Sequence, residues 1–123
     1  MKKKRILVVE DFEQTRVFVQ KSLERKGFDV VLAKNGMEAL AFLQTNAFDL
    51  VITDYEMPSM NGIQFISEMR ENSFFSQTPV ILLSANYGII QKKTQDLGIN
   101  CFLPKPFDIG TFYKMVDRSL HFS

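Results

Sequence analysis

The chain reads DLVITDYEMP over residues 49–58, an apolar run that stops abruptly at the acidic residue Asp54. Continuous runs rich in β-branched residues are typical of strands that are buried on both faces of a sheet. Four similar runs begin near residues 5, 29, 79 and 100, and a stretch with helical spacing follows each run. Five strand–helix repeats predict a doubly wound α/β fold, because right-handed crossovers place helices on both faces of a parallel sheet.

The predicted elements fill a single domain over residues 1–123. The strands are expected at about residues 5–10, 29–33, 49–53, 79–83 and 100–103. The helices are expected at residues 12–26, 37–46 and 87–97, after Gly62, and from the N-cap Asp108 onward. Gly27 is the predicted C-cap residue of the first helix.

The composition excludes several classes of protein. The 15 basic residues nearly balance the 14 acidic residues, which argues against a dedicated nucleic-acid binder. No apolar run approaches the roughly 20 residues of a membrane span, and no signal-peptide core follows the N-terminal lysines. The single Cys101 and the single His121 exclude a disulfide framework and a thiolate- or histidine-rich metal site. We therefore expect a cytoplasmic domain whose chemistry depends on carboxylates, hydroxyls, lysines or the backbone.

Polar residues follow four of the five predicted strands. In order along the chain they are Glu10, Asp11, Asp54, Ser84 and Lys105. In a doubly wound sheet, ligands bind beyond the carboxyl ends of the strands, where these side chains would meet. Like charges about 4 Å apart repel by roughly 4 kcal/mol at an effective dielectric constant near 20, so clustered carboxylates require a cation. Oxygen ligands favour a hard ion such as Mg²⁺.

Each of these residues also has an ordinary structural interpretation. The acids could be helix caps or solvated loop residues, with Asp11 capping the following helix and Asp54 capping a turn. Ser84 could satisfy a loop amide, and Lys105 could be a surface lysine. Motifs for other chemistries are absent from the sequence: it has no GxxxxGK[ST] phosphate loop, no GxGxxG after the first strand and no GxSxG elbow. The convergence on one sheet edge therefore favours a functional cluster of carboxylates with one lysine and one hydroxyl.

The same residues resemble the receiver domain of bacterial-type response regulators. The segments that carry the resemblance are ILVVED (residues 6–11), DLVITDYEMP (49–58), MNG (60–62), LSA (83–85) and LPKPF (103–107). The resemblance covers essentially the whole chain. It implies a flavodoxin-like sheet with strand order 2-1-3-4-5, which places the first and third strands side by side.

The resemblance also implies a role for each residue of the cluster. Asp54 corresponds to the phospho-acceptor. Asp11 and Asp54 correspond to the side-chain ligands of Mg²⁺, Glu10 to the acid that holds a metal-bound water, and the backbone carbonyl of Glu56 to a further ligand. Lys105 corresponds to the ammonium that contacts a phosphoryl oxygen.

Two further residues correspond to the switch of the family. Ser84 matches the hydroxyl that turns toward the phosphoryl group. Phe102 matches the aromatic residue whose rotamer changes with the position of that hydroxyl. The Lys105–Pro106 bond is expected to be cis. Glu10, Ser84 and Phe102 replace the Asp, Thr and Tyr that are more common in the family.

The implied function is a phosphorylatable switch in a two-component system or phosphorelay, not an enzyme beyond self-catalysed phosphoryl acceptance and hydrolysis. The implied donor is a histidine kinase or a histidine phosphotransfer protein. A downstream protein or a second copy would bind the face formed by residues 87–97, the last strand and the last helix. No direct binding to nucleic acid is expected, and the chain is either a stand-alone receiver or a piece of a longer protein.

Two alternatives stay open from the sequence. A pseudo-receiver would be a constitutive protein-interaction module, although such modules usually lack the acceptor or the lysine. A metal-dependent phosphatase would want a D-x-D motif after a strand, and Asp54-Tyr55-Glu56 only approximates that motif.

Overall fold

The five strands pair in parallel in the order β2-β1-β3-β4-β5, which confirms the predicted fold and strand order. The computed structural model describes residues 2–85, 94–99 and 101–121. The strands are β1 (Arg5–Val9), β2 (Asp29–Ala33), β3 (Leu50–Asp54), β4 (Val80–Ser84) and β5 (Cys101–Pro104). The helices are α1 (Glu13–Arg25), α2 (Gly36–Leu43), α3 (Gly62–Glu71) and α5 (Ile109–His121), with short 3-10 turns η1 (Ser73–Phe75) and η2 (Gln95–Leu97).

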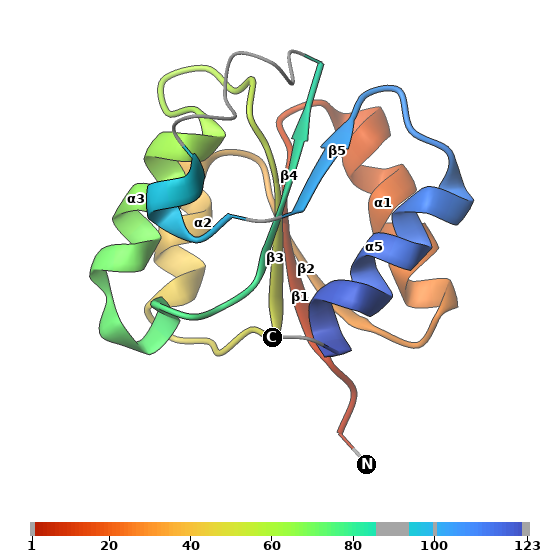
Figure 1. The fold of residues 1–123 in the computed structure, drawn as a ribbon, viewed down its shortest axis with the longest axis horizontal. Helices are drawn as coiled ribbons and strands as arrows, with labels where there is room; N and C mark the ends of the chain where they lie inside the picture. Colours follow the sequence, from red (N-terminus) through yellow and green to blue (C-terminus); the bar gives the residue numbers. More distant parts are fainter. Residues whose placement is uncertain (1, 86–93, 100, 122–123) are drawn as a thin grey trace.

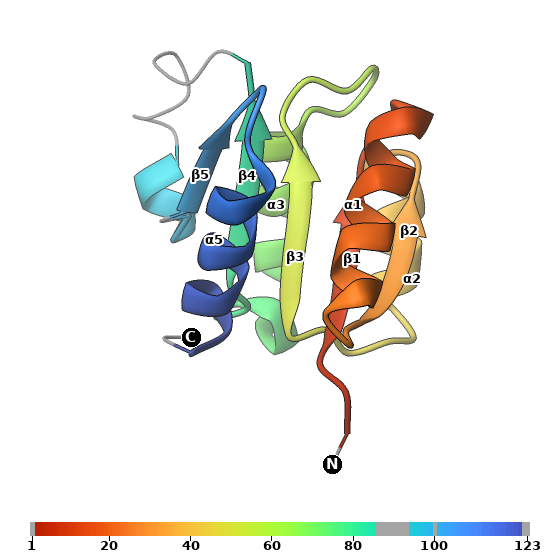
Figure 2. The ribbon, with the colours of Figure 1, turned by 90° about the vertical axis from the view of Figure 1, so that its right-hand side faces the viewer.

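Helices cover both faces of the sheet, as Figure 1 shows with the sheet seen nearly edge-on. Successive residues of a strand point to opposite faces. Leu7 and Val9 of β1 therefore belong to the core beneath α2 and α3, whereas Ile6 and Val8 belong to the core beneath α1 and α5. Figure 2 shows that α1 and α5 lie on the same face of the sheet, with the arrowheads of all strands at one edge.

Most predicted helices are observed, with shifted ends. Asp108 caps α5 as expected, since its side chain accepts a hydrogen bond from the backbone N–H of Thr111 at 2.8 Å. The predicted helix over residues 37–46 is too long, because α2 ends at Leu43 and the side chain of Asn46 donates to the carbonyl of Phe42. Of the predicted helix over residues 87–97, residues 87–93 lie outside the described residues, and residues 95–97 form η2.

Strands β3, β4 and β5 each end one residue beyond their predicted ends, whereas β1 ends at Val9, one residue before its predicted end. Asp54 is the last residue of β3 and Ser84 is the last residue of β4. The ladder continues because the backbone N–H of Tyr55 donates to the carbonyl of Leu83, and the N–H of Lys105 donates to the carbonyl of Ser84. Both side chains are consequently held by the sheet itself rather than by a loop.

The loop after β3 closes back onto the strand at Gly62, whose N–H donates to the carbonyl of Tyr55 at 2.9 Å. A Cβ atom at this position would overlap the carbonyl oxygen of Asp54 and lie 3.0 Å from Cα of Tyr55. Gly62→Ala is therefore expected to lower the free energy of unfolding by about 2 kcal/mol, measured by urea denaturation, because rigid backbone must move.

Gly36→Ala is the matched control for this substitution. Both glycines are the first residue of a helix, but a Cβ at Gly36 would meet only the side chain of Met60, which is flexible. The control is expected to change stability by less than about 1 kcal/mol. Equal losses in the two variants would contradict a specific backbone clash at Gly62.

None of the helices among the described residues combines the length and the apolar content that a membrane span requires.

Candidate functional site

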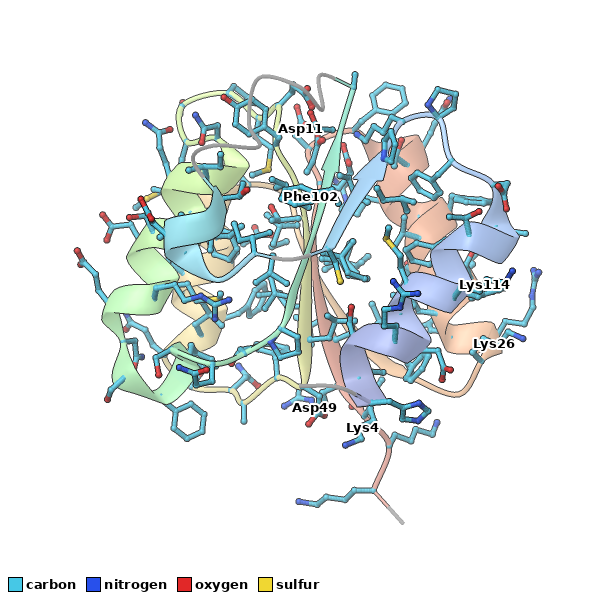
Figure 3. The ribbon with its side chains drawn as sticks, viewed as in Figure 1. Lys4, Asp11, Lys26, Asp49, Phe102 and Lys114 are labelled. Atoms are coloured by element: carbon cyan, nitrogen blue, oxygen red, sulfur yellow. The ribbon has the colours of Figure 1, made fainter. Side chains whose placement is uncertain are left out.

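The carboxyl ends of the strands bring the five predicted residues together at one edge of the sheet. Strand β3 lies between β1 and β4, so Asp54 lies next to the end of β1 and pairs with Leu83 of β4. Ser84 is in turn the register partner of Pro104, the residue before Lys105. Figure 3 shows Asp11 at this edge and Asp49 at the opposite edge. The topology thus converts four separate strand ends into one site.

Lys105 links the two buried carboxylates of the site. Its Nζ atom lies 3.0 Å from Oδ1 of Asp54 and 3.1 Å from Oε2 of Glu10. Burial alone would lower the pKa of Lys105, but the Asp54 and Glu10 carboxylates outweigh it and raise that pKa above its ordinary value. The ammonium therefore stays protonated at neutral pH and offers one positive charge to two acids.

The negative charge of Asp54 is only partly balanced by its surroundings, because Lys105 also contacts Glu10. The residue is 2% exposed, and burial raises the pKa of its carboxyl from 3.8 to about 7, with the Glu10 charge adding to the rise and Lys105 opposing it. Its Oδ1 atom is fully buried and accepts no aligned hydrogen bond from the described residues, despite the ion pair with Lys105. An under-satisfied buried oxygen of this kind is costly unless another cationic group approaches it.

The two acids after β1 have different surroundings. Glu10 is buried, and its two oxygens contact the backbone N–H of Phe12 at 3.2 Å and Nζ of Lys105. Asp11 is exposed. The N-cap of α1 is Phe12 rather than Asp11, so the capping interpretation of Asp11 is wrong. The Asp11 carboxylate is left at the edge of the site.

The geometry of these acids fits a small divalent cation. One carboxylate oxygen from each of Glu10, Asp11 and Asp54 lies within 4.8 Å of the others. All three donors are hard oxygens, which suits Mg²⁺, and Mg²⁺ keeps several waters and so needs few protein ligands. The under-satisfied Oδ1 of Asp54 provides an acceptor that such a cation would satisfy. The residues present therefore fit the predicted metal, with Asp11 and Asp54 as the acids least engaged elsewhere.

Ser84 contacts an unexpected partner. Its hydroxyl is buried and donates to Oε1 of Glu56 at 3.0 Å. The sequence pointed only to the backbone carbonyl of Glu56, so this side-chain contact was missed. Phe102, the other predicted switch residue, is partly buried and packs against the core beneath α2 and α3; Figure 3 labels it beside the central strands. The Lys105–Pro106 bond is cis, as expected.

Arg16 is a second contributor that sequence reasoning missed. Its guanidinium donates to the backbone carbonyls of Glu10, at 2.9 Å, and Asp11, at 3.3 Å. These bonds run from the first turns of α1 to the loop that carries both acids, and they restrain the direction of that loop. The available signal was an arginine five residues after an acidic pair, a spacing too common to single out without the structure.

Comparison with known proteins gives one consistent result. The family model for the response regulator receiver domain matches residues 6–117. Over 98% of its own length, the chain is 38% identical to the uncharacterized transcriptional regulatory protein YkoG of Bacillus subtilis. It spans about half the length of YkoG and of two further curated regulators.

Solved structures agree with this result. The chemotaxis protein CheY4 of Vibrio cholerae is 32% identical, with a TM-score of 0.92 over 97% of this chain and 100% of CheY4. The receiver domain of the sensor histidine kinase PA1611 from Pseudomonas aeruginosa shares the fold, with a TM-score of 0.88 over 98% of this chain and 99% of that one at 23% identity. That domain was solved with a magnesium ion in its active-site cleft.

Proposed function

Since the chain belongs to the response regulator receiver family, whose members are switches of two-component systems, we propose that it accepts a phosphoryl group on Asp54. The donor is a phosphohistidine of a histidine kinase or of a histidine phosphotransfer protein. The observation that carries this proposal is the buried Asp54 carboxylate with one under-satisfied oxygen and the Lys105 ammonium 3.0 Å away. A purely structural ion pair would not need the second buried acid, Glu10, at the same ammonium.

The chemistry of transfer follows from these charges. A carboxylate oxygen of Asp54 forms a bond to phosphorus while the bond from phosphorus to the histidine nitrogen breaks and imidazole leaves. Because both reactants are anionic, positive charge has to offset the phosphoryl oxygens in the loose transition state. Lys105 offers one such charge, and the sheet holds Asp54 in a fixed direction for in-line attack. Mg²⁺, held by Asp11, Asp54 and the Glu56 carbonyl with Glu10 beside it, would supply the remaining positive charge.

The affinity for Mg²⁺ is expected to depend on Asp11. With few protein ligands the ion should bind in the sub-millimolar to millimolar range, and Asp11→Asn is expected to weaken binding about tenfold because a charged ligand becomes neutral. Isothermal titration calorimetry measures this change. Asp117→Asn, an exposed acid on α5, is the control and should bind like the wild type. Unchanged affinity in Asp11→Asn would place the metal elsewhere.

Incubation with phosphoramidate tests the proposed function directly. Intact-mass spectrometry is expected to show one added phosphoryl group when Mg²⁺ is present, and little or none when the ion is removed with EDTA. Failure of the wild type with small donors and with phosphohistidine proteins, at saturating Mg²⁺, would contradict the proposal. That outcome would favour a constitutive interaction module instead.

The phosphoryl group would act through Ser84 and Phe102. It replaces one negative charge with about two, so new charge-assisted contacts form at Ser84 and Lys105. The responding face would comprise β5, α5 and the segment of residues 87–97, of which residues 87–93 lie outside the described part of the chain. A downstream protein or a second copy of the chain would bind this face, in a cytoplasmic switch formed by one domain over residues 1–123.

A further inference from the structure

The side chain of Glu56 occupies hydrogen-bond donors at the edge of the site. Its Oε1 atom accepts from the hydroxyl of Ser84 at 3.0 Å and lies 3.3 Å from the backbone nitrogen of Ala85, which also donates to it. Glu56 lies two residues after Asp54 in the chain, while Ser84 ends the neighbouring strand β4. One carboxylate oxygen therefore holds two donors beside the acceptor strand.

This donor pair can bind an anionic oxygen either of the Glu56 carboxylate or of a phosphoryl group. A hydroxyl and a backbone N–H that converge on one carboxylate oxygen can bind a phosphoryl oxygen with the same geometry. Asp54 and Ser84 are the last residues of the neighbouring parallel strands β3 and β4, so a phosphoryl group on Asp54 would lie at the same edge of the sheet as this donor pair. Glu56 and the product then compete for the same hydrogens, and as like charges they also repel each other.

We propose that the Glu56 carboxylate is an internal competitor that holds Ser84 and Ala85 while Asp54 is unmodified and has to leave when the phosphoryl group arrives. This inference rests on the proposed function. Glu56 is exposed, whereas Ser84 is buried, so the carboxylate can rotate into water while the donors remain at the site. Breaking the contact therefore costs part of the free energy that the phosphoryl group gains when it binds Ser84 and Ala85.

The competition has a measurable consequence. In the released state, the Glu56 carboxylate has left Ser84 and Ala85. If a ligand binds only this state, its apparent dissociation constant equals the intrinsic constant divided by the fraction of molecules in the released state. Because the net contribution of hydrogen bonds at an exposed side chain is small, this contact leaves roughly 10–30% of molecules with Glu56 detached from Ser84 and Ala85. Removal of the contact should therefore tighten binding of a phosphoryl mimic about three- to tenfold.

Glu56→Asp separates this contact from a general charge effect. The variant keeps the negative charge but withdraws the carboxylate by about one C–C bond, roughly 1.5 Å, so the hydrogen bond to Ser84 is lost. We expect it to bind beryllofluoride, in the presence of Mg²⁺, three- to tenfold more tightly than the wild type. Glu56→Gln has the opposite combination, because its amide oxygen can still accept while its charge is gone. A gain in the Gln variant without a gain in the Asp variant would mean charge repulsion alone, and would overturn the proposal.

The background Ser84→Ala tests whether the gain depends on the shared donor. In that background Glu56→Asp is expected to change beryllofluoride affinity by less than about twofold, since the principal bond of Glu56 is already absent. A full gain there would also overturn the proposal. Failure of the wild type to bind beryllofluoride at all would instead contradict the proposed function, so the two failures are distinguishable.

The contact itself can be tested by NMR without the mimic. The Ala85 amide resonance should shift in Glu56→Asp, and an unmoved resonance would contradict the contact.

Discussion

Asp54→Asn is expected to form no phosphoryl adduct under conditions in which the wild type is fully modified, a loss of at least about 100-fold in the rate of uptake. An amide oxygen lacks the negative charge that makes the carboxylate a nucleophile. The substitution nearly preserves the shape of the side chain, so the buried end of β3 keeps its packing. Intact-mass spectrometry after incubation with phosphoramidate and Mg²⁺ measures the effect.

Neighbouring acids make this a demanding test of the acceptor. Glu10 and Asp11 each have an oxygen within 4.8 Å of the Asp54 carboxylate, so proximity alone does not distinguish the three. Their contacts and exposure do, since both Glu10 oxygens are already engaged, by Lys105 and by the backbone N–H of Phe12, and Asp11 is open to water. Asp117→Asn should be modified like the wild type. A persistent adduct on Asp54→Asn would move the acceptor to Asp11 or Glu10.

The position of the site could be predicted from the sequence because few physical rules determine it. Apolar runs such as residues 50–53 can be buried on both faces only in a sheet covered by helices, and parallel strands end at one edge. Asp54 and Lys105 therefore had to approach each other once the strand order was known. Their contact at 3.0 Å agrees with that expectation, while their catalytic roles stay predictions.

The local contacts could not be predicted because they depend on side-chain rotamers and neighbouring backbone. The hydrogen bond from Ser84 to Glu56 joins residues 28 positions apart, and nothing in the spacing indicates it. The exact end of β3 depends on a carbonyl of β4, at Leu83, rather than on the residues of β3. For the same reason, Arg16 gains a role only once α1 is placed over the loop of Glu10.

In the metal-free protein, Asp54→Asn is expected to increase stability at pH 8 by on the order of 2–4 kcal/mol and to have little effect near pH 4. Burial and the Glu10 charge raise the pKa of Asp54 from 3.8 to about 7 in the folded protein. The unfolded chain thus loses this proton at lower pH than the folded chain. The stability contribution of Asp54 is therefore fully present below about pH 4 and is lost as the pH rises through about 7.

The physical basis of this pH dependence is one ammonium shared by two buried acids. Asp54→Asn leaves Lys105 with Glu10 alone, a balanced pair at 3.1 Å, and so removes the excess negative charge. Urea unfolding in EDTA at several pH values between 4 and 8 measures the difference between variant and wild type, with Asp117→Asn as the control for loss of an exposed acid. Addition of Mg²⁺ at pH 8 should reduce the difference, because the cation stabilises the folded wild type more than the variant. A stability difference that stays constant from pH 4 to pH 8 would show that Asp54 is not held at unfavourable charge, and the electrostatic account of the site would be wrong.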